Sequence, residues 1–196
     1  MSKIYLIGGV GAGKSTVLSI LKTEYGAEII LADDEARRLM EPGDAGYDAV
    51  VRTFGTEYLS ADGTIDRQKL AARIFRDPEA KKTIDQLIHP MTWKVIDEKM
   101  SASGADLVIT EAAVFDADAR KRYFDEVWYV RTDPEIRIKR LMESRGYSEE
   151  KCRAMIENQF TDEEYARQAD RVIDNSGTEE DVRAQLRTIM EERTKR

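Results

Sequence analysis

Hydrophobic and polar positions alternate along the chain in a way that predicts short buried strands separated by longer amphipathic helices. Five short apolar segments, rich in β-branched or aromatic residues, stand between stretches with helical spacing. Strands that alternate with helices form a parallel sheet with helical crossovers, so the pattern predicts an α/β fold. The expected strands are Ile4–Ile7, Glu28–Leu31, Leu107–Thr110, Val127–Val130 and Arg171–Ile173.

The helical stretches have ends that capping residues and glycines mark. Ser148 and Asp133 each offer a side-chain oxygen to the free N–H groups of a helix start, and Gly146 is expected to end the helix before it. The charged run Glu191–Arg196 is expected to be a solvated, fraying terminus. The expected helices are Lys14–Tyr25, Asp34–Met40, Tyr47–Phe54, Arg67–Phe75, Glu79–Met100, Pro134–Ser144, Ser148–Gln159 and Thr178–Glu192.

The size of the chain bounds its organisation. A sequence of 196 residues with 41% hydrophobic content buries one sizeable core but is short for two independent domains, and no repeat or linker divides it. About seventy residues, roughly 32–104, separate the second and third expected strands, which is far more than one crossover helix needs. We expect this insertion to hold a second substrate.

Trp128 and Tyr129, within the fourth strand, are expected to be core.

A glycine-rich segment after the first strand carries the clearest chemistry. Gly8 to Ser15 read GGVGAGKS, which fits the spacing G-x-x-x-x-G-K-[ST] of a phosphate-binding loop. Glycines let successive backbone N–H groups turn toward a polyphosphate, and the following helix start adds partial positive charge. Lys14 is expected at the β- and γ-phosphates, and Ser15 at a phosphate-bound Mg²⁺. The expected ATP-binding residues here are Gly9, Gly11, Ala12, Gly13, Lys14, Ser15 and Thr16.

Charge and cysteine content exclude several classes of partner. A formal net charge of −7 and a pI near 5.0 argue against a broad surface for nucleic acid or anionic membrane. The single cysteine, Cys152, cannot form an internal disulfide and is expected at a plain helix position. The first residues lack the basic start and unbroken apolar segment typical of a signal peptide, and no run approaches the roughly 20 apolar residues that span a bilayer. We therefore expect a cytoplasmic, soluble protein, a monomer or small homo-oligomer.

Acidic and basic side chains near the expected ligand crevice suggest phosphoryl transfer. Asp33 follows the second strand, on the side of the sheet where α/β folds bind ligands, so it is a candidate general base. It is alternatively the N-cap of the helix from Asp34. Arg137 and Arg140 are three residues apart and share a helix face. We interpret Arg140 as a phosphate ligand and Arg137 as an ordinary solvated position.

Besides the glycine-rich loop, the sequence contains several further segments in a characteristic order: Leu31–Asp33 before Ala36-Arg37, Asp62–Arg67, Ile74–Pro78, Leu87–Pro90, Arg140 with Arg145, Gln159 and Ala169–Asn175. Together these segments resemble the dephospho-coenzyme A kinase family in order and spacing, over nearly the whole chain. The resemblance implies transfer of the γ-phosphate of ATP to the 3′-hydroxyl of the ribose of dephospho-coenzyme A. It also implies a P-loop NTPase fold, a three-layer α/β/α arrangement with a five-stranded parallel sheet, a helical substrate-binding insertion and a helical lid.

The resemblance also implies roles for single residues and boundaries for the parts of one kinase domain. Asp33 would accept the hydroxyl proton, Lys14 with Ser15-bound Mg²⁺ would clamp the phosphates, and Arg140 would be a lid arginine. The core would comprise 1–31, 105–134 and 168–196, the insertion about 32–104 and the lid about 135–167. The implied acceptor-binding residues are Asp33, Arg37, Arg67 and His89.

Two of the implied residues have equally good structural interpretations. Asn175 matches the segment near the adenine base, but asparagine is also common wherever a chain turns. His89 is the only histidine. It is either part of the acceptor pocket or, with Pro90 after it, a kinked helix start packed against the core.

The sequence departs from the family pattern at a few positions. Leu31 replaces the first acid of an Asp-Ala-Asp segment, and Ile7 stands where threonine is frequent before the double glycine. The stretch Glu111–Asp116 replaces a Pro-Leu-Leu-Phe-Glu-like segment. Glu111 is expected to take the place of a strand-end aspartate that holds Mg²⁺ through water.

Other functions stay open on these residues. A P-loop kinase for another small hydroxyl or nucleotide acceptor has the same fold, and a relative that binds nucleotide but has lost catalysis fits the altered acid pair. A GTP-dependent switch needs a guanine-reading Asn-Lys-x-Asp segment, which the sequence lacks.

Overall fold

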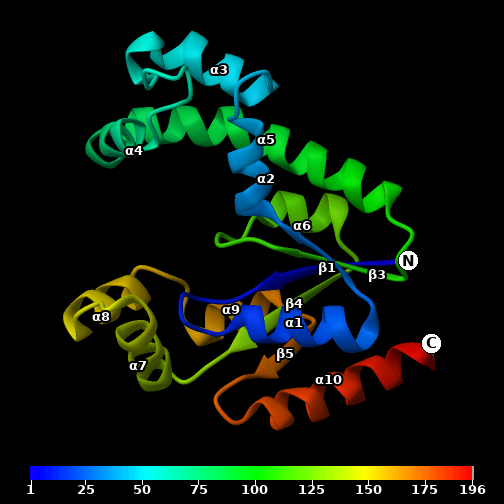
Figure 1. The fold of residues 1–196 in the computed structure, drawn as a ribbon. Helices are drawn as coiled ribbons and strands as arrows, with labels where there is room; N and C mark the ends of the chain where they lie inside the picture. The colour runs from blue at the N-terminus through cyan, green and yellow to red at the C-terminus, as the bar shows by residue number, and fades with distance from the viewer. Residues whose placement is uncertain (196) are drawn as a thin grey trace. The chain divides into compact units, whose positions relative to one another are not determined.

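The predicted five-stranded parallel sheet is present. In the computed structural model, which describes residues 1–195, the strands lie in the order β2-β3-β1-β4-β5, as Figure 1 shows. Strand β1 lies at the centre and pairs in parallel with β3 and β4, and β4 pairs in parallel with β5. The strands are β1 (Ser2–Ile7), β2 (Glu28–Leu31), β3 (Leu107–Glu111), β4 (Glu126–Arg131) and β5 (Arg171–Asp174).

The chain divides into two compact units. One comprises Met1–Ile30 with Ser103–Arg196, and the other is Leu31–Ala102. The first contains most of the sheet and the glycine-rich loop. The second contains helices, the last residue of β2 and an isolated antiparallel bridge between Leu59 and Ile65.

Helices cover both faces of the sheet in the first unit. On one face, α1 (Lys14–Tyr25) and α10 (Glu179–Thr194) lie side by side (Figure 1). Their apolar residues form one core with strand residues that include Ile4, Leu6 and Trp128. Burial of these continuous apolar strands is what a parallel sheet between helical layers requires. Trp128 and Tyr129 are 0% and 1% exposed, which confirms them as core.

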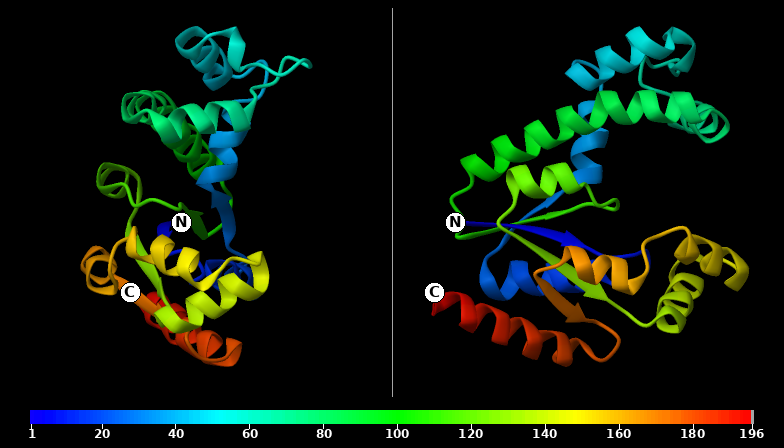
Figure 2. Two further views of the ribbon diagram at one scale, coloured as in Figure 1. Left: turned by 90° about the vertical axis from the view of Figure 1, so that its left-hand side faces the viewer. Right: turned by 180° about the vertical axis from the view of Figure 1, so that it is seen from behind.

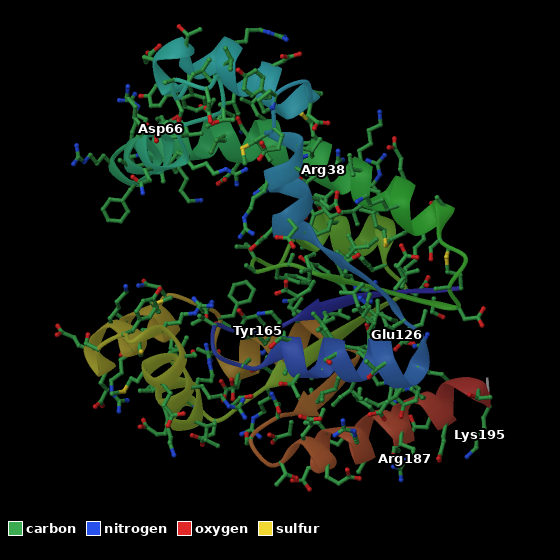
Figure 3. All side chains as sticks on the ribbon, in the orientation of Figure 1. Arg38, Asp66, Glu126, Tyr165, Arg187 and Lys195 are labelled. Carbon is green, nitrogen blue, oxygen red and sulfur yellow. The ribbon has the colours of Figure 1, made fainter. Side chains whose placement is uncertain are left out.

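Two short helices that the sequence pattern did not predict, α6 (Ala117–Tyr123) and α9 (Asp162–Gln168), belong to the opposite layer. Tyr129 of β4 stacks on Tyr165 of α9 with ring centroids 5.0 Å apart; Figure 3 labels Tyr165. Both helices have seven residues, too few to display a clear 3.6-residue period. Capping marks their starts instead, since Asp116 caps α6 and Thr161 opens a capping box on α9.

The helices α7 (Pro134–Arg145) and α8 (Glu149–Glu157) have the predicted caps. Asp133 accepts from the N–H of Glu135, Ser148 accepts from the N–H of Lys151, and Gly146 ends α7 in the left-handed conformation at φ 63°. Cys152 is fully buried in α8, in a cluster with residues of α7, so its interpretation as a plain helix position is confirmed.

The expectation of a fraying terminus from Glu191 is wrong for the described residues, because α10 continues to Thr194. Arg193 holds this last turn. Its Nη1 donates to Oε1 of Glu126 at 2.5 Å, and its guanidinium lies 5.6 Å from the ring of Trp128. Figure 3 labels Glu126. A carboxylate and an indole from the start of β4 thus give a terminal arginine two partners that a charge run does not reveal.

The second unit has its own small core and surface turns. Apolar residues of three helices meet there, among them Val50, Leu70 and Ile88. An ion pair between Lys99 and Glu35, with Nζ and Oε1 2.5 Å apart, joins α2 to the long helix α5. Figure 2 shows α5 from two further directions. The elements are α2 (Ala32–Leu39), α3 (Ala45–Phe54), the 3₁₀ turn η1 (Thr56–Tyr58), α4 (Arg67–Arg76) and α5 (Pro78–Ala102). Within residues 1–195, no helix is both long enough and apolar enough to cross a bilayer.

Candidate active site

The loop between β1 and α1 presents backbone N–H groups that have no acceptor in the described part of the protein. Gly13 is the N-cap of α1 in the left-handed conformation, φ 77°, and no side chain caps the helix. Among residues 1–195, the N–H groups of Gly11, Gly13 and Lys14 donate to no protein acceptor. Unused N–H groups at an uncapped helix start attract an anion. The predicted phosphate-binding geometry is therefore supported at the level of the backbone.

Lys14 is held at the mouth of this loop by two oxygens. Its Nζ donates to the carbonyl of Gly8 at 2.8 Å and lies 3.2 Å from Oε1 of Glu111, both side chains being 17% exposed. The parallel register sets Glu111, the last residue of β3, beside Leu6 of β1. The ammonium is thereby fixed next to the loop rather than left to sample many rotamers.

Ser15, Thr16 and Ala12 complete the loop in different ways. Ser15 is exposed in the first turn of α1, so its hydroxyl is accessible. The N–H of Thr16 donates to the carbonyl of Gly13 at 3.0 Å. Ala12 is 1% exposed and its methyl group belongs to the main core, so only its backbone can serve a ligand.

Arg137 is not a solvated position, which corrects the expectation from the sequence. It is 3% exposed, its Nε donates to the carbonyl of Val10 at 2.9 Å, and its Nη2 donates to Oε1 of Gln159 at 2.8 Å. The same Gln159 oxygen accepts from the N–H of Val10 at 2.9 Å. Burial lowers the pKa of Arg137 from its ordinary value. Arg137 and Gln159 thus grip the tip of the loop.

This grip explains one glycine of the motif. A Cβ at position 9 would lie 2.2 Å from Nη2 of Arg137 and 2.8 Å from Oε1 of Gln159. To relieve this clash, the buried guanidinium of Arg137 would have to move and give up its hydrogen bonds to Val10 and Gln159. Gly9 is therefore required by a side chain outside the motif.

Arg140 lies one helical turn beyond Arg137 and keeps part of its guanidinium unpaired. Its Nη2 donates to the backbone carbonyl of Asn175 at 2.9 Å. Its Nη1 is buried and, among residues 1–195, has no hydrogen-bond partner. A Cβ at Gly13 would lie 3.2 Å from this Nη1, which places the free donor beside the loop. A buried unpaired donor is costly, and an anionic ligand in the loop would satisfy it.

Asn175 is a buried part of the loop's support, not only a turn residue. It is 3% exposed, and its Nδ2 donates to the carbonyl of Ala12 at 2.8 Å and less favourably to that of Gly13 at 3.4 Å. Thr132, which sequence reasoning missed, donates to the same Ala12 carbonyl at 2.9 Å. A single threonine after a strand carries no motif, and only its position after β4 beside the loop reveals it.

In the second unit, Asp33 is an exposed residue in the first turn of α2. The helix begins at Ala32, with Leu31 as its N-cap and no side-chain cap, so the alternative that Asp33 caps a helix from Asp34 is wrong. Ala32, which is buried, is the first helical residue. Arg37 pairs with Asp34 at 2.8 Å, both side chains being exposed.

Arg67 and His89 are also exposed. Arg67 pairs with Glu41 at 2.6 Å and its Nη2 reaches the carbonyl of Arg37 at 3.3 Å, so these two predicted acceptor residues meet. His89 lies inside α5, 54% exposed, with Nε2 3.8 Å from Oδ1 of Asp85. The alternative of a helix start packed against the core is therefore wrong, because α5 begins at Pro78 and continues past Pro90.

Comparison with known proteins decides the family. Residues 3–181 match the family model described as "Dephospho-CoA kinase". A dephospho-CoA kinase of Geobacillus kaustophilus is 36% identical over 192 residues, which cover 96% of this chain and 95% of the relative. The chain belongs to the dephospho-CoA kinase family.

Solved structures agree with this family in fold. A crystal structure of a Thermus thermophilus protein superposes with a TM-score of 0.79 at 28% identity and covers 97% of both chains. The dephospho-CoA kinase of Campylobacter jejuni superposes with a TM-score of 0.72 at 24% identity, covering 98% of this chain and 97% of its own. The P-loop kinase fold predicted for this dephospho-CoA kinase family member is thus confirmed.

Proposed function

We propose that the protein transfers the γ-phosphate of ATP to the 3′-hydroxyl of the ribose of dephospho-coenzyme A, giving coenzyme A and ADP. The observation that carries this function is the family match over residues 3–181, with relatives of that name covered almost end to end. The chemistry of the loop supports it, because Lys14 and Nη1 of Arg140 lie beside loop N–H groups that donate to no protein acceptor among residues 1–195.

Phosphate binding and charge stabilisation are the tasks of the first unit. Phosphoryl transfer spreads negative charge over the γ-phosphate oxygens and demands positioning more than covalent chemistry. The free N–H groups of Gly11 and Gly13 would bind the triphosphate, and Lys14 would pair with its β- and γ-oxygens. Nη1 of Arg140, which is buried and has no hydrogen-bond partner in the described part of the chain, would bind the developing charge.

The residues present fit a magnesium ion. Mg²⁺ prefers oxygen ligands, and Ser15 offers an exposed hydroxyl while Glu111 offers a carboxylate at the end of the neighbouring strand. Glu111 already faces Lys14, so we propose that it would act through a water molecule. When bound, the ion would neutralise charge on the β- and γ-phosphates.

The acceptor is activated, in this proposal, by Asp33. The ribose 3′-oxygen attacks the γ-phosphorus, its proton passes to the Asp33 carboxylate, and the bond from the γ-phosphorus to the bridging oxygen breaks so that ADP leaves with the electron pair. Asp33 is exposed and makes no ion pair within its own unit. Arg37, Arg67 and His89 would bind the acceptor, whose phosphates suit guanidinium groups.

We further propose the division of labour that the sequence suggested. The insertion of about 32–104 would bind the acceptor, and about 135–167 would act as a lid that excludes water from the γ-phosphate. We place the reaction in the cytoplasm, since the single cysteine is a free, buried thiol. The active species would be a monomer or a small homo-oligomer.

An acceptor panel tests the function directly. Purified protein with Mg²⁺ and ATP is offered dephospho-coenzyme A, shikimate or a nucleoside monophosphate, and the phosphorylated product is identified. We expect 3′-phosphorylation of dephospho-coenzyme A to exceed turnover of the other acceptors by several powers of ten. Faster turnover of another acceptor would reject the assignment, and ATP binding without any turnover would indicate a relative that has lost catalysis.

A further inference from the structure

One carbonyl of the phosphate loop is held by two side chains from outside the loop. The oxygen of Ala12 accepts from Nδ2 of Asn175 at 2.8 Å and from Oγ1 of Thr132 at 2.9 Å. Thr132 follows β4 and is 1% exposed, and Asn175 follows the neighbouring strand β5 and is 3% exposed. The sheet therefore delivers two buried donors to a single loop atom.

The two donors are not equal. The hydroxyl of Thr132 also lies 2.8 Å from the carbonyl of Arg131, and a hydroxyl has one proton to give, so that proton is shared. The amide of Asn175 has two protons, and Nδ2 approaches both Ala12 and, at 3.4 Å, Gly13. Asn175 therefore makes the stronger hydrogen bond to the loop carbonyl of Ala12.

Holding a carbonyl fixes the N–H group on the other side of the same peptide. A trans peptide is planar, so its C=O and N–H point in opposite directions. Because the carbonyl of Ala12 is drawn toward the strand ends, the N–H of Gly13 is turned away from them. That N–H has no protein acceptor within residues 1–195.

Glycine makes this support necessary. Gly13 has φ 77°, and a glycine peptide can rotate into several conformations that other residues avoid. Without a fixed carbonyl, the peptide between Ala12 and Gly13 can turn its N–H out of the loop. The cost of aligning it would then fall on ligand binding.

Asn175 also sets the arginine opposite. Its backbone carbonyl accepts from Nη2 of Arg140 at 2.9 Å, while Nη1 lies buried beside Gly13 with no partner among the residues that the structure describes. One residue thus aligns a loop N–H with its side chain and a guanidinium with its backbone.

We propose that Asn175 and Thr132 are positioning residues for the phosphate tail of the nucleotide, and that Asn175 does not select the base. This inference rests on the proposed function, in which the loop binds ATP. It assigns Asn175 a task different from the adenine contact that the resemblance implied. The consequence is a loss of affinity on mutation that does not depend on the base.

Binding of ATP and of inorganic tripolyphosphate, measured by calorimetry, separates the two tasks. Asn175→Leu should raise the dissociation constants of both by the same factor, about ten- to a hundred-fold. Thr132→Val should raise both about three-fold or more, and Thr132→Ser, which keeps the hydroxyl, should restore them. An Asn175→Leu loss confined to ATP, with tripolyphosphate unchanged, would overturn the inference in favour of base contact.

Matched controls exclude a general effect on folding. Ser176 neighbours Asn175 and accepts from the N–H of Asp133 at 3.0 Å, and Thr92 donates to the carbonyl of Ile88 at 2.9 Å inside α5. Ser176→Ala and Thr92→Val should leave both dissociation constants within about two-fold. Should Asn175→Leu not fold, Thr132→Val carries the test, because valine matches threonine in shape.

The two levels of the proposal fail differently. If the wild-type protein binds tripolyphosphate but does not phosphorylate dephospho-coenzyme A, the proposed function fails while the positioning roles are still measured. If the wild type is active and Thr132→Val and Asn175→Leu bind tripolyphosphate normally, the positioning inference alone is wrong. If the wild type binds neither ATP nor tripolyphosphate, both are wrong.

Discussion

The unit with the glycine-rich loop and the unit Leu31–Ala102 hold their candidate residues in opposite ways. Near the loop, Arg137 and Asn175 are each 3% exposed and donate to loop backbone atoms. In the other unit, the side chains of Arg37 and His89 are 59% and 54% exposed and face acids on their own helices. Asp33 is exposed as well.

The difference matters for binding energy. Groups already fixed by buried hydrogen bonds need no further ordering when a ligand arrives, and this preorganisation is the main source of electrostatic catalysis. Surface ion pairs between neighbouring turns are worth little, so they can be exchanged for a substrate phosphate at small cost. We infer that the phosphate half is built in advance and that the acceptor half is ordered by its substrate.

The strongest test removes the fixed ammonium. Lys14→Ala should lower kcat by several powers of ten, because a positioned cation at the transferring phosphoryl group is lost. Steady-state kinetics with saturating substrates measure it. Lys14→Arg keeps the charge but changes the geometry, so it should recover only part of the rate. A fall in kcat of less than about ten-fold in Lys14→Ala would contradict preorganisation by this residue.

The second test addresses the exposed unit. Asp33→Asn should lower kcat by about 10²–10⁴, since the base that takes the hydroxyl proton is lost, while the dissociation constant of ATP stays within about two-fold. Asp34→Asn is the matched control, because Asp34 is the adjacent exposed acid and pairs only with Arg37 among the described residues of its unit. Equal kcat values in the wild type and Asp33→Asn would remove Asp33 from the mechanism.

The sequence predicted the elements that long patterns define. All five strands, the eight expected helices and the loop are present, with bounds within two residues of those that periodicity and glycine spacing predicted. The short helices α6 and α9 were missed because seven residues do not show a period. The last turn of α10 was misjudged because its anchor, Glu126, comes from a distant strand.

The site shows a similar limit at the level of single residues. Arg137 and Arg140 are both arginines on one helix face. No local pattern therefore distinguishes Arg137, which is almost fully buried, from Arg140, whose Nη1 has no partner among the described residues. The difference between them comes from long-range contacts: Arg137 donates to the carbonyl of Val10, and Arg140 donates to the carbonyl of Asn175. Thr132 carries no local signal at all, and its role depends on which loop carbonyl the sheet places beside it.

A third test loosens the built-in grip on the loop. Arg137→Met removes the side-chain donor of the Val10 carbonyl and leaves Oε1 of Gln159 with only the N–H of Val10, so we expect a loss of about 1–3 kcal/mol in the free energy of unfolding. ATP affinity should fall about ten-fold because the loop tip becomes mobile. Denaturant unfolding and calorimetry measure the two effects. Arg145→Ala, an exposed change at the end of the same helix, should stay within about 0.5 kcal/mol.

The smallest effect concerns acid stability in the unit that carries the loop. Backbone and side-chain bonds from Thr161 lower the pKa of Glu164, and those from Thr178 lower the pKa of Asp181, in the capping boxes of α9 and α10. A carboxyl group whose folded pKa lies below its unfolded value stabilises the fold above the unfolded pKa, near 4, and loses this as the pH falls through the folded value.

A double variant with Glu164→Gln and Asp181→Asn keeps an oxygen acceptor in each capping box but removes the titrating carboxyl group. We therefore expect the wild type to unfold at a slightly higher temperature than the double variant at pH 7, and the gap to narrow between about pH 5 and pH 3. Glu163→Gln, in the same first turn of α9 but without a capping bond, should not reproduce the narrowing. A gap that stays constant down to pH 3 would mean that the caps act through geometry alone, since a charge-dependent contribution must vanish once both carboxylates are protonated.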